Sequence, residues 1–438
     1  MGLKSRLEYE LTAWVAQTSF LRKDSAMRIL ALDLAKNKSV YVDYFTGGGD
    51  RHFGKISTNA GDLQKLLLRC SPDRLVIEAC PAAGWVCDLA QKMEIPVQVA
   101  NANDERWKWK TVKDKSDRKD GLKLAVMSEM ESLPTVHVPK PAVRQWRSLI
   151  EYRHNLVDRR TAIKNSIRAI YEREGLSLPS VRKAWTSEAL EGLKKQASRA
   201  SAEQLWLFQV GCELQQLEQV QKQIEQVEGK LKEFAESKEA VKRLQTAPCV
   251  GPRLSEAVVA ILDDPHRFKN GRQVGCYAGL TPRRWQSGES DRQGHISKAG
   301  NRLLRKLLVE IAWLGVRNRT WMLEVYEQVR RGSEKRKKIA IVAVARRLLV
   351  RLWAMLRDGT EWKEASGALP PDPQDLSLDA PPAEGVKGNG PSKVARPVSR
   401  KVVHVGAPVA SQQSRILRVD DKSVTRRRKS GKVLARIK

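Results

Sequence analysis

Side chains that could do chemistry on a phosphate lie in two separated blocks of this chain. Asp33 ends the apolar run MRILALD, Glu78 follows the run in DRLVIEA, and Asp117 and Asp120 lie three residues apart in KSDRKDGLKLA. Ser287 lies far downstream, in GLTPRRWQSGES. Carboxylate oxygens suit Mg²⁺ and Mn²⁺, and a pair of such ions about 4 Å apart clamps the attacking and leaving oxygens of phosphoryl transfer. The four carboxylates therefore predict a metal site.

The segment around Ser287 contains many basic residues. A serine hydroxyl attacks only when a base, a cation cluster or a metal stabilises the alkoxide and the phosphate transition state. Basic side chains that would surround a bound phosphate lie nearby: Arg283, Arg284, Arg292, Lys298, Arg302 and Arg305. Ser290 and Ser297 are rivals in the same loop, Ser287-Gly288 also suits an ordinary turn, and no Asp and His spacing supports a hydrolase triad. Spacing alone does not choose this serine.

Each carboxylate also has an ordinary structural interpretation. An Asp at a strand end often forms a turn. Acidic residues beside Lys115, Arg118 and Lys119 often form a solvated charge patch. The order of the carboxylates along the chain favours a metal site: an Asp and a Glu on strands come first, and an Asp pair that opens a helix follows. The two residues of that pair are at i and i+3, so they share one face of the helix.

The elements that must position the carboxylates alternate in type. Residues 28–34, 39–45 and 52–58 have the pattern of strands. The following elements are expected to be a helix at 59–70, a strand at 74–79, a helix at 84–94 and a strand at 96–101. We expect a mixed α/β layer structure with the carboxylates at strand ends.

The middle of the chain is predicted to be helical, from about residue 142 to 245. Apolar residues recur there at steps of three and four: Leu214, Leu217, Val220, Ile224, Val227, Leu231 and Phe234. The spacing fits an antiparallel hairpin within the chain and a coiled coil between chains equally well. A turn containing Pro248, Gly251 and Pro252 follows; it either offers backbone amides to a phosphate or simply joins two helices.

The expected organisation has five parts. They are an N-terminal arm (1–26), an α/β catalytic domain (27–141), a helical or coiled-coil region (142–239), a mainly α second catalytic domain with the serine (240–358) and a disordered basic tail (359–438). The tail is rich in Pro, Ser, Gly and Ala and cannot bury enough apolar surface to offset its ordering entropy. We expect it to add nonspecific affinity for nucleic acid; a solubility tail is the alternative.

The overall charge favours a polyanionic partner. The 438 residues hold 80 Lys and Arg against 50 Asp and Glu, a formal charge of +30. Counterion release makes nucleic acid the preferred partner. The most apolar stretch, IAIVAVARRLLVRLWAML, is interrupted by arginines and predicts a packed helix, so no membrane partner is expected. Six cysteines without zinc spacing, and no signal peptide, are typical of a cytoplasmic protein.

Two motifs resemble one known family. KSDRKDGLKLA resembles the K-T-D-x-x-D-A-x-x-L-A motif of the DEDD transposases of bacterial insertion sequences, which are also described as bridge-RNA-guided serine recombinases and are related to pilin-gene invertases. YAGLTPRRWQSG and ISKAGNRLLR resemble the second-domain motif of that family. The resemblance covers about residues 27–358. The chain departs from the family pattern at Gly121, where Ala is usual, and at Cys249, where Gly is usual.

The resemblance implies a fold and a mechanism. It implies a RuvC-like, RNase H-type first domain in which Asp33, Glu78, Asp117 and Asp120 bind Mg²⁺ or Mn²⁺, and a covalent nucleophile at Ser287. It also implies DNA as substrate, a noncoding guide RNA, and a homodimer or homotetramer with sites shared between subunits. Rivals are an invertase with the same residues, a Holliday-junction resolvase or nuclease that uses only the carboxylates, and a catalytically silent nucleic-acid-binding protein.

Overall fold

The computed structural model describes residues 26–47, 50–101, 104, 116–178, 183–287 and 290–363, without the side chains of Ser290 and Gln293. The expected arm at 1–26 and basic tail at 359–438 therefore lie almost entirely outside the described residues. None of the helices that the structure does describe has the length and hydropathy needed to cross a bilayer.

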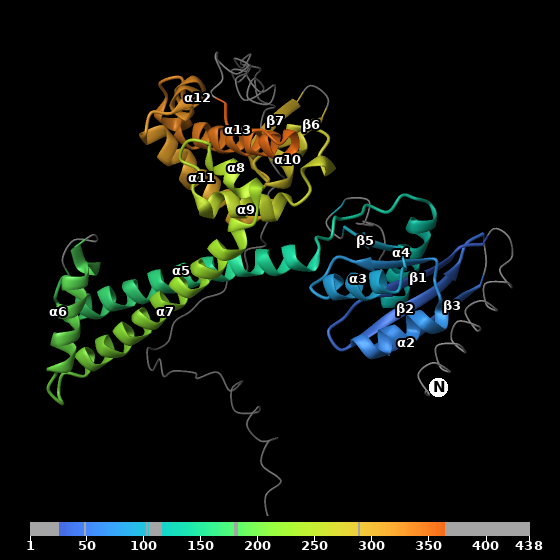
Figure 1. The fold of residues 1–438 in the computed structure, drawn as a ribbon, viewed down its shortest axis with the longest axis horizontal. Coiled ribbons are helices and arrows are strands. Elements are labelled where there is room, and N and C mark those ends of the chain that lie inside the picture. Colours follow the sequence, from blue (N-terminus) through green and yellow to red (C-terminus); the bar gives the residue numbers. More distant parts are fainter. Residues whose placement is uncertain are drawn as a thin grey trace, which may run out of the picture. The chain divides into compact units, whose positions relative to one another are not determined.

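The first part of the chain folds around a five-stranded mixed sheet (Figure 1). Its elements are β1 (Arg28–Asp33), β2 (Lys38–Phe45), β3 (Arg51–Ser57), α2 (Ala60–Cys70), β4 (Arg74–Glu78), α3 (Ala83–Lys92), β5 (Val97–Ala100) and α4 (Asp117–Glu129). The strand order is β3-β2-β1-β4-β5. Strands β1, β4 and β5 are parallel, and β2 and β3 are antiparallel to their neighbours. The expected mixed α/β structure is confirmed.

Helices cover both faces of this sheet. Leu30, Leu32 and Ile77 pack against α2 and α3, whereas Ile29 and Ala31 pack toward α4. Burial on both faces explains why β1 and β4 are almost continuously apolar rather than alternating. The edge strand β3 is polar and largely exposed, which discourages pairing with another sheet.

The middle of the chain is an antiparallel pair of long helices, α5 (Pro141–Arg173) and α7 (Leu205–Glu236), which lie side by side in Figure 1. The short helix α6 (Ser187–Ser198) lies between them in sequence. Three bonds fix the antiparallel register, since α7 numbers fall as α5 numbers rise: Arg153 to Glu228, Arg160 to Gln221 and Ser166 to Glu213. The apolar stripe on α7 is therefore buried within the chain, as the hairpin alternative predicts.

The last part forms one large core of mostly helical elements. They are α8 (Glu239–Gln245), α9 (Pro252–Leu262), α10 (Gly271–Tyr277), the hairpin strands β6 (Pro282–Ser287) and β7 (Ser290–Ile296), α11 (Arg302–Arg317), α12 (Trp321–Arg330) and α13 (Lys337–Asp358). Short 3₁₀ turns occupy Lys183–Trp185, Pro265–Arg267 and Glu334–Arg336. Helix α13 is the arginine-interrupted apolar stretch, and it packs against α8 to α12.

The expected boundaries at 142 and 239 do not coincide with core boundaries. Trp146 and Ile150 of α5, and Leu231 and Ala235 of α7, are buried in the same core as α9 and α13. Arg147 supports this attachment by donating to the carbonyl oxygen of Ile261 at 3.0 Å. The base of the helical hairpin thus belongs to the second core, because both long helices carry apolar residues beyond their mutual contact.

Candidate active site

The strand register places Asp33 and Glu78 at the same edge of the sheet. Leu32 pairs with Ile77 in the parallel β1–β4 ladder, and each carboxylate is the next and last residue of its strand. Alternation along a strand puts both on the face of Ala31 and Val76, which is the α4 face. Both side chains are half-buried. Two carboxylates that are far apart in sequence thus become neighbours.

Helix α4 brings the other two carboxylates toward this edge. Ser116 caps the helix by accepting a bond from the backbone N–H of Lys119, and Asp117 and Asp120 lie in its first turn. The far end of α4 is fixed at the opposite edge, where Arg74, the first residue of β4, bonds the hydroxyl of Ser128 at 3.2 Å. The helix therefore runs against β1, β2 and β4, and its first turn lies toward the carboxyl ends of β1 and β4.

Gly121 sets how closely this first turn approaches the sheet. A Cβ atom added at Gly121 would lie 2.8 Å from a methyl carbon of Val42 on β2. Such a distance forces a shift of one partner, so glycine permits a closer approach than the alanine of the family motif. The departure at this position has a packing consequence beside the carboxylates.

A lysine lies among the carboxylates. Burial lowers the pKa of Lys123, and the charges of Asp120 and Glu78 oppose that effect, so all three groups are within electrostatic reach. Asp120 is half-buried and Asp117 is exposed. Among the described residues, no group of three or more His, Cys, Asp or Glu side chains is arranged to hold a metal ion. The donor set suits Mg²⁺ chemically, but in this arrangement it is not gathered into ligand geometry.

Ser287 is the last residue of β6, at the end of a two-stranded antiparallel ribbon. It pairs with Ser290 of β7, and its side chain is exposed. Alternation places Trp285 and Ser287 on one face of β6 and Arg284 and Gln286 on the other, whereas Arg283 lies where the register with β7 shifts. The structure thus presents the Ser287 hydroxyl on the surface, in the same strand as two of the predicted phosphate ligands.

The predicted cationic ligands differ in the hydrogen bonds and ion pairs that they already form within the protein. Arg284 forms an ion pair with Asp291 across the ribbon, with 2.7 Å between Nε and Oδ1. Arg305 is half-buried and donates to the carbonyl oxygens of Ala278 and Gly300 at 3.0 and 2.8 Å. That bonding ties the start of α11 to the loop before β6, so Arg305 has a structural role whatever else it binds.

The remaining predicted cations are more open. Arg283 donates to the carbonyl oxygen of Ser297 at 3.3 Å, which is a weak restraint. Lys298 and Arg302 are exposed, and Lys298 has a left-handed backbone with φ of 56°. Arg283, Lys298 and Arg302 are therefore better placed than Arg305 to meet a phosphate. Roles as nucleic-acid ligands stay predictions.

One further group, Lys123, was not identified from the sequence. Its position three residues after Asp120 was the available signal, since that spacing shares a helix face. Arg292 was among the basic residues expected around a bound phosphate, and the strand register places it directly opposite Trp285.

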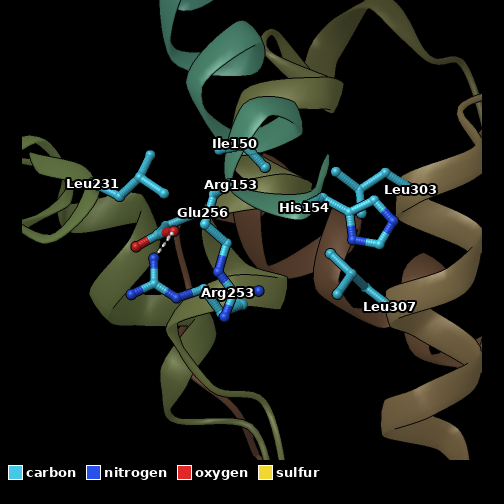
Figure 2. Close-up of a pocket in the computed structure, with 8 residues that line it drawn as sticks. All are labelled: Ile150, Arg153, His154, Leu231, Arg253, Glu256, Leu303 and Leu307. Carbon is cyan, nitrogen blue, oxygen red and sulfur yellow. Dashed lines mark hydrogen bonds and ion pairs between the residues drawn. The ribbon is translucent and has the colours of Figure 1, made fainter. Parts of the chain in front are cut away.

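The pocket in Figure 2 is distinct from both groups of predicted catalytic residues. Its lining comes from α5, α7, α9 and α11: Ile150, Arg153, His154, Leu231, Arg253, Glu256, Leu303 and Leu307. Its volume of about 20 Å³ has room for about one water molecule and not for a nucleotide. Glu256 is buried there and pairs with Arg253 at 2.9 Å. The pocket belongs to the packing of the second core.

The turn before α9 contains the second departure from the family pattern. Cys249 has a left-handed φ of 63°, a conformation that glycine adopts without strain. Its sulfur accepts a weak bond from the side-chain amide of Asn318 at 3.6 Å. The backbone conformation at this turn is thus the one that glycine favours, although the residue is cysteine.

The chain is similar to known transposases. Residues 241–327 match the model of the Transposase IS116/IS110/IS902 family. The transposase for insertion sequence element IS1111A of Coxiella burnetii is 28% identical over 346 residues, which are 75% of this chain and 90% of that protein. A probable family 20 transposase of Pseudomonas aeruginosa is 27% identical over 335 residues, 75% of this chain and 96% of that protein.

A shorter part of the chain is similar to a gene-inverting protein. The pilin gene-inverting protein of Moraxella lacunata is 30% identical over 115 residues, 26% of this chain and 36% of that protein. The match to the family model contains Ser287 and the whole β6–β7 ribbon. The similarity to the transposases also extends over most of the chain, so the family resemblance of the two motifs is confirmed. Residues 241–327 thus carry a domain of the IS116/IS110/IS902 transposase family, and the chain is similar to transposases over about three quarters of its length.

Proposed function

We propose that this chain is the transposase of an insertion sequence and moves DNA by cutting and rejoining it at Ser287. The observation that carries the proposal is the exposed serine at the end of β6, inside the matched transposase domain and beside open cations. Pre-arranged positive charge stabilises the negative charge that develops on a phosphate under attack. Arg283, Arg284 and Lys298 are proposed to supply it.

The proposed reaction has two balanced steps. The Ser287 oxygen forms a bond to the DNA phosphorus as one phosphorus–oxygen bond of the strand breaks, and the departing DNA oxygen takes a proton. A DNA hydroxyl then attacks the phosphoserine and releases the serine oxygen, which regains a proton. One phosphate ester is exchanged for another in each step, so rejoining needs no ATP.

The carboxylate edge is proposed to bind Mg²⁺ or Mn²⁺ together with DNA. Magnesium usually binds proteins through one or two carboxylates and completes its shell with water and substrate phosphate oxygens. Asp33, Glu78, Asp117 and Asp120 would thus gather around the ion only when DNA is present. The bound ion would neutralise charge on the phosphate that Ser287 attacks.

A covalent-trapping assay with DNA that includes the sequences flanking the gene tests the serine. Wild-type protein should form a denaturant-resistant adduct, with the phosphate on Ser287. Ser287→Ala should abolish both the adduct and strand exchange, whereas the control Ser297→Ala should retain both. Continued cutting by Ser287→Ala without an adduct would support a resolvase or nuclease instead.

The remaining parts of the proposal concern the fold of the first domain, the assembly of subunits and a guide RNA. A RuvC-like first domain, a site shared between subunits of a homodimer or homotetramer, and a noncoding guide RNA all rest on the family resemblance. Pairing of a guide RNA with DNA would place sequence choice in bases rather than side chains. Sequencing small RNAs that copurify with the full chain tests the guide. Recovery of only degraded bulk RNA would count against it.

DNA inversion is a second candidate, supported by the similarity to the Moraxella lacunata protein. The same residues would perform the same chemistry on two sites in one chromosome. A reporter with two inverted copies of the flanking DNA separates the candidates. Inversion without excision or insertion elsewhere would favour an invertase.

A further inference from the structure

A large aromatic side chain lies on the surface two residues before Ser287. Trp285 is 57% exposed, although an indole is normally among the more buried groups of a protein. Alternation along β6 places it on the same face of the ribbon as Ser287. The two Cα positions of Trp285 and Ser287 are separated by about 7 Å, the rise of two strand residues.

The ring is held in place by a glycine on the neighbouring strand. A Cβ atom added at Gly294 of β7 would lie 2.5 Å from Cζ3 and 2.9 Å from Cη2 of Trp285. Such distances do not occur between real side chains, so the six-membered ring lies directly over the bare backbone of Gly294. The ribbon therefore covers one side of the indole and leaves much of the rest open.

Positive charge surrounds this exposed ring. Arg292 is directly opposite Trp285 in the strand register and is exposed. Arg283, also exposed, lies two residues before Trp285 on β6, where the register with β7 shifts. An exposed ring between guanidinium groups is the combination by which proteins hold single-stranded nucleic acid, with cations on the backbone and an aromatic platform under a base. A protein partner with an apolar patch would have to leave these cations without a counterion.

We propose that Trp285 is a stacking platform for an unpaired nucleobase of the DNA, next to the phosphodiester that Ser287 attacks. A base inside a duplex has both faces covered by its neighbours, so stacking on Trp285 requires a base that is unstacked at the reacting step. Trp285 would then act as a positioning residue that holds the strand while Arg283 and Arg292 bind its phosphates. The inference rests on the proposed function for its location beside the reacting phosphate.

Photocrosslinking locates the base contact directly. A single-stranded DNA that carries iododeoxyuridine is irradiated with the full-length protein, and the tryptic peptides are identified by mass spectrometry. Cleavage after Arg284 and Arg292 releases the peptide WQSGESDR, in which Trp285 is the only aromatic residue. We expect a crosslink in this peptide from wild-type protein and from Ser287→Ala. Its absence from wild-type protein would overturn the inference.

An affinity comparison measures the stacking. Oligothymidylate is compared with an abasic oligomer of equal length, which has the same phosphates but no bases. Trp285→Ala should weaken oligothymidylate binding about 5- to 100-fold and leave abasic binding unchanged. Gly294→Ala should weaken it too, because the added methyl displaces the ring without removing it. Equal affinity of Trp285→Ala and wild-type protein for oligothymidylate would contradict the platform.

Two controls make the result specific. Gln286 is also exposed but lies on the opposite face of β6, so Gln286→Ala should bind both oligomers like wild-type protein. Ser287→Ala should bind both oligomers normally, because binding does not need the nucleophile. A loss of adducts with Ser287→Ala alone therefore tests the chemistry, and a loss of base-dependent binding with Trp285→Ala alone tests the platform. A larger loss for Gln286→Ala than for Trp285→Ala would refute the assignment.

Discussion

The carboxylate edge and the serine ribbon are positioned by different physical means. Asp33 and Glu78 end two strands of a sheet whose faces are both buried, so neighbouring core residues restrict where the carboxylates lie. Ser287 ends an exposed ribbon whose surface carries Arg283 and Trp285. The proposed metal ligands would need fixed geometry, whereas the proposed nucleophile, which must reach a long polyanion, would need access. The difference predicts that substitutions in the two regions act on different properties.

The largest expected effect tests the core beneath the carboxylates. Ile77 is fully buried and immediately precedes Glu78. Ile77→Ala should lower the free energy of unfolding by about 2 to 5 kcal/mol, because it removes buried methyl groups and leaves a cavity. Urea denaturation, with hydrogen exchange of the β1 and β4 peptides, measures the loss. Trp285→Ala is the matched control in the ribbon and should leave unfolding nearly unchanged. Similar losses of unfolding free energy in both variants would show that the two regions do not differ in their dependence on a buried core.

A smaller effect is expected where α4 meets the sheet. Gly121→Ala should cost about 1 to 3 kcal/mol of unfolding free energy, since the new methyl crowds Val42. The double variant Gly121→Ala with Val42→Ala should recover much of this loss. Magnesium-dependent adduct formation should fall and recover in parallel, while oligothymidylate binding stays constant. Additive losses in the double variant would show that the two side chains do not share one contact.

The second core contains a buried acid, and its effect on stability should depend on pH. Burial raises the pKa of Glu256, although Arg253 opposes the shift. The folded state then holds a proton that the unfolded state has lost, so this group makes stability fall as pH rises between its ordinary pKa and its raised pKa. Glu256→Gln should remove that part of the slope, as urea denaturation across this window would measure. An unchanged slope would mean that Arg253 compensates fully.

The smallest effect concerns charge on the ribbon. A hydrogen bond from Arg284 lowers the pKa of Asp291, so in the free protein this arginine is already paired. Asp291→Asn should free Arg284 for DNA and make the logarithm of affinity depend more steeply on salt, by about one phosphate contact. Titrations of oligothymidylate at several salt concentrations measure the slope. Asp264→Asn, in the exposed turn before the 3₁₀ segment Pro265–Arg267, serves as a control of equal charge. Equal slopes in both variants would assign the change to net charge.

The sequence predicted the elements of the sheet well because their patterns are local. Apolar runs, turn residues and the spacing of Asp117 and Asp120 each act within a few neighbours, and β1, β4 and α4 formed where those signals placed them. The register that joins Asp33 to Glu78 could be expected only as a shared edge, since pairing depends on the whole sheet. The choice between an internal hairpin and a coiled coil between chains was also open, because α7 presents the same stripe to either partner.

The sequence predicted which residues belong to the candidate site better than it predicted their contacts. Carboxylates and cations are visible as residues, but their present partners are set by tertiary contacts. The backbone bonds of Arg305 arise because α11 starts beside Ala278, and the pair of Arg284 with Asp291 depends on ribbon register. Lys123 lies near Glu78 only because α4 runs against β4. These partners are distant in sequence, and no local pattern encodes them.

The hairpin of α5 and α7 restricts how this part of the molecule can change in length. Adding one residue to α5 would rotate everything beyond it by about 100°, which would turn Ile167 and Ile170 away from α7. A shorter or longer version must therefore gain or lose about seven residues at once, and it must do so in both arms. Natural length variants of this hairpin should come in such paired steps.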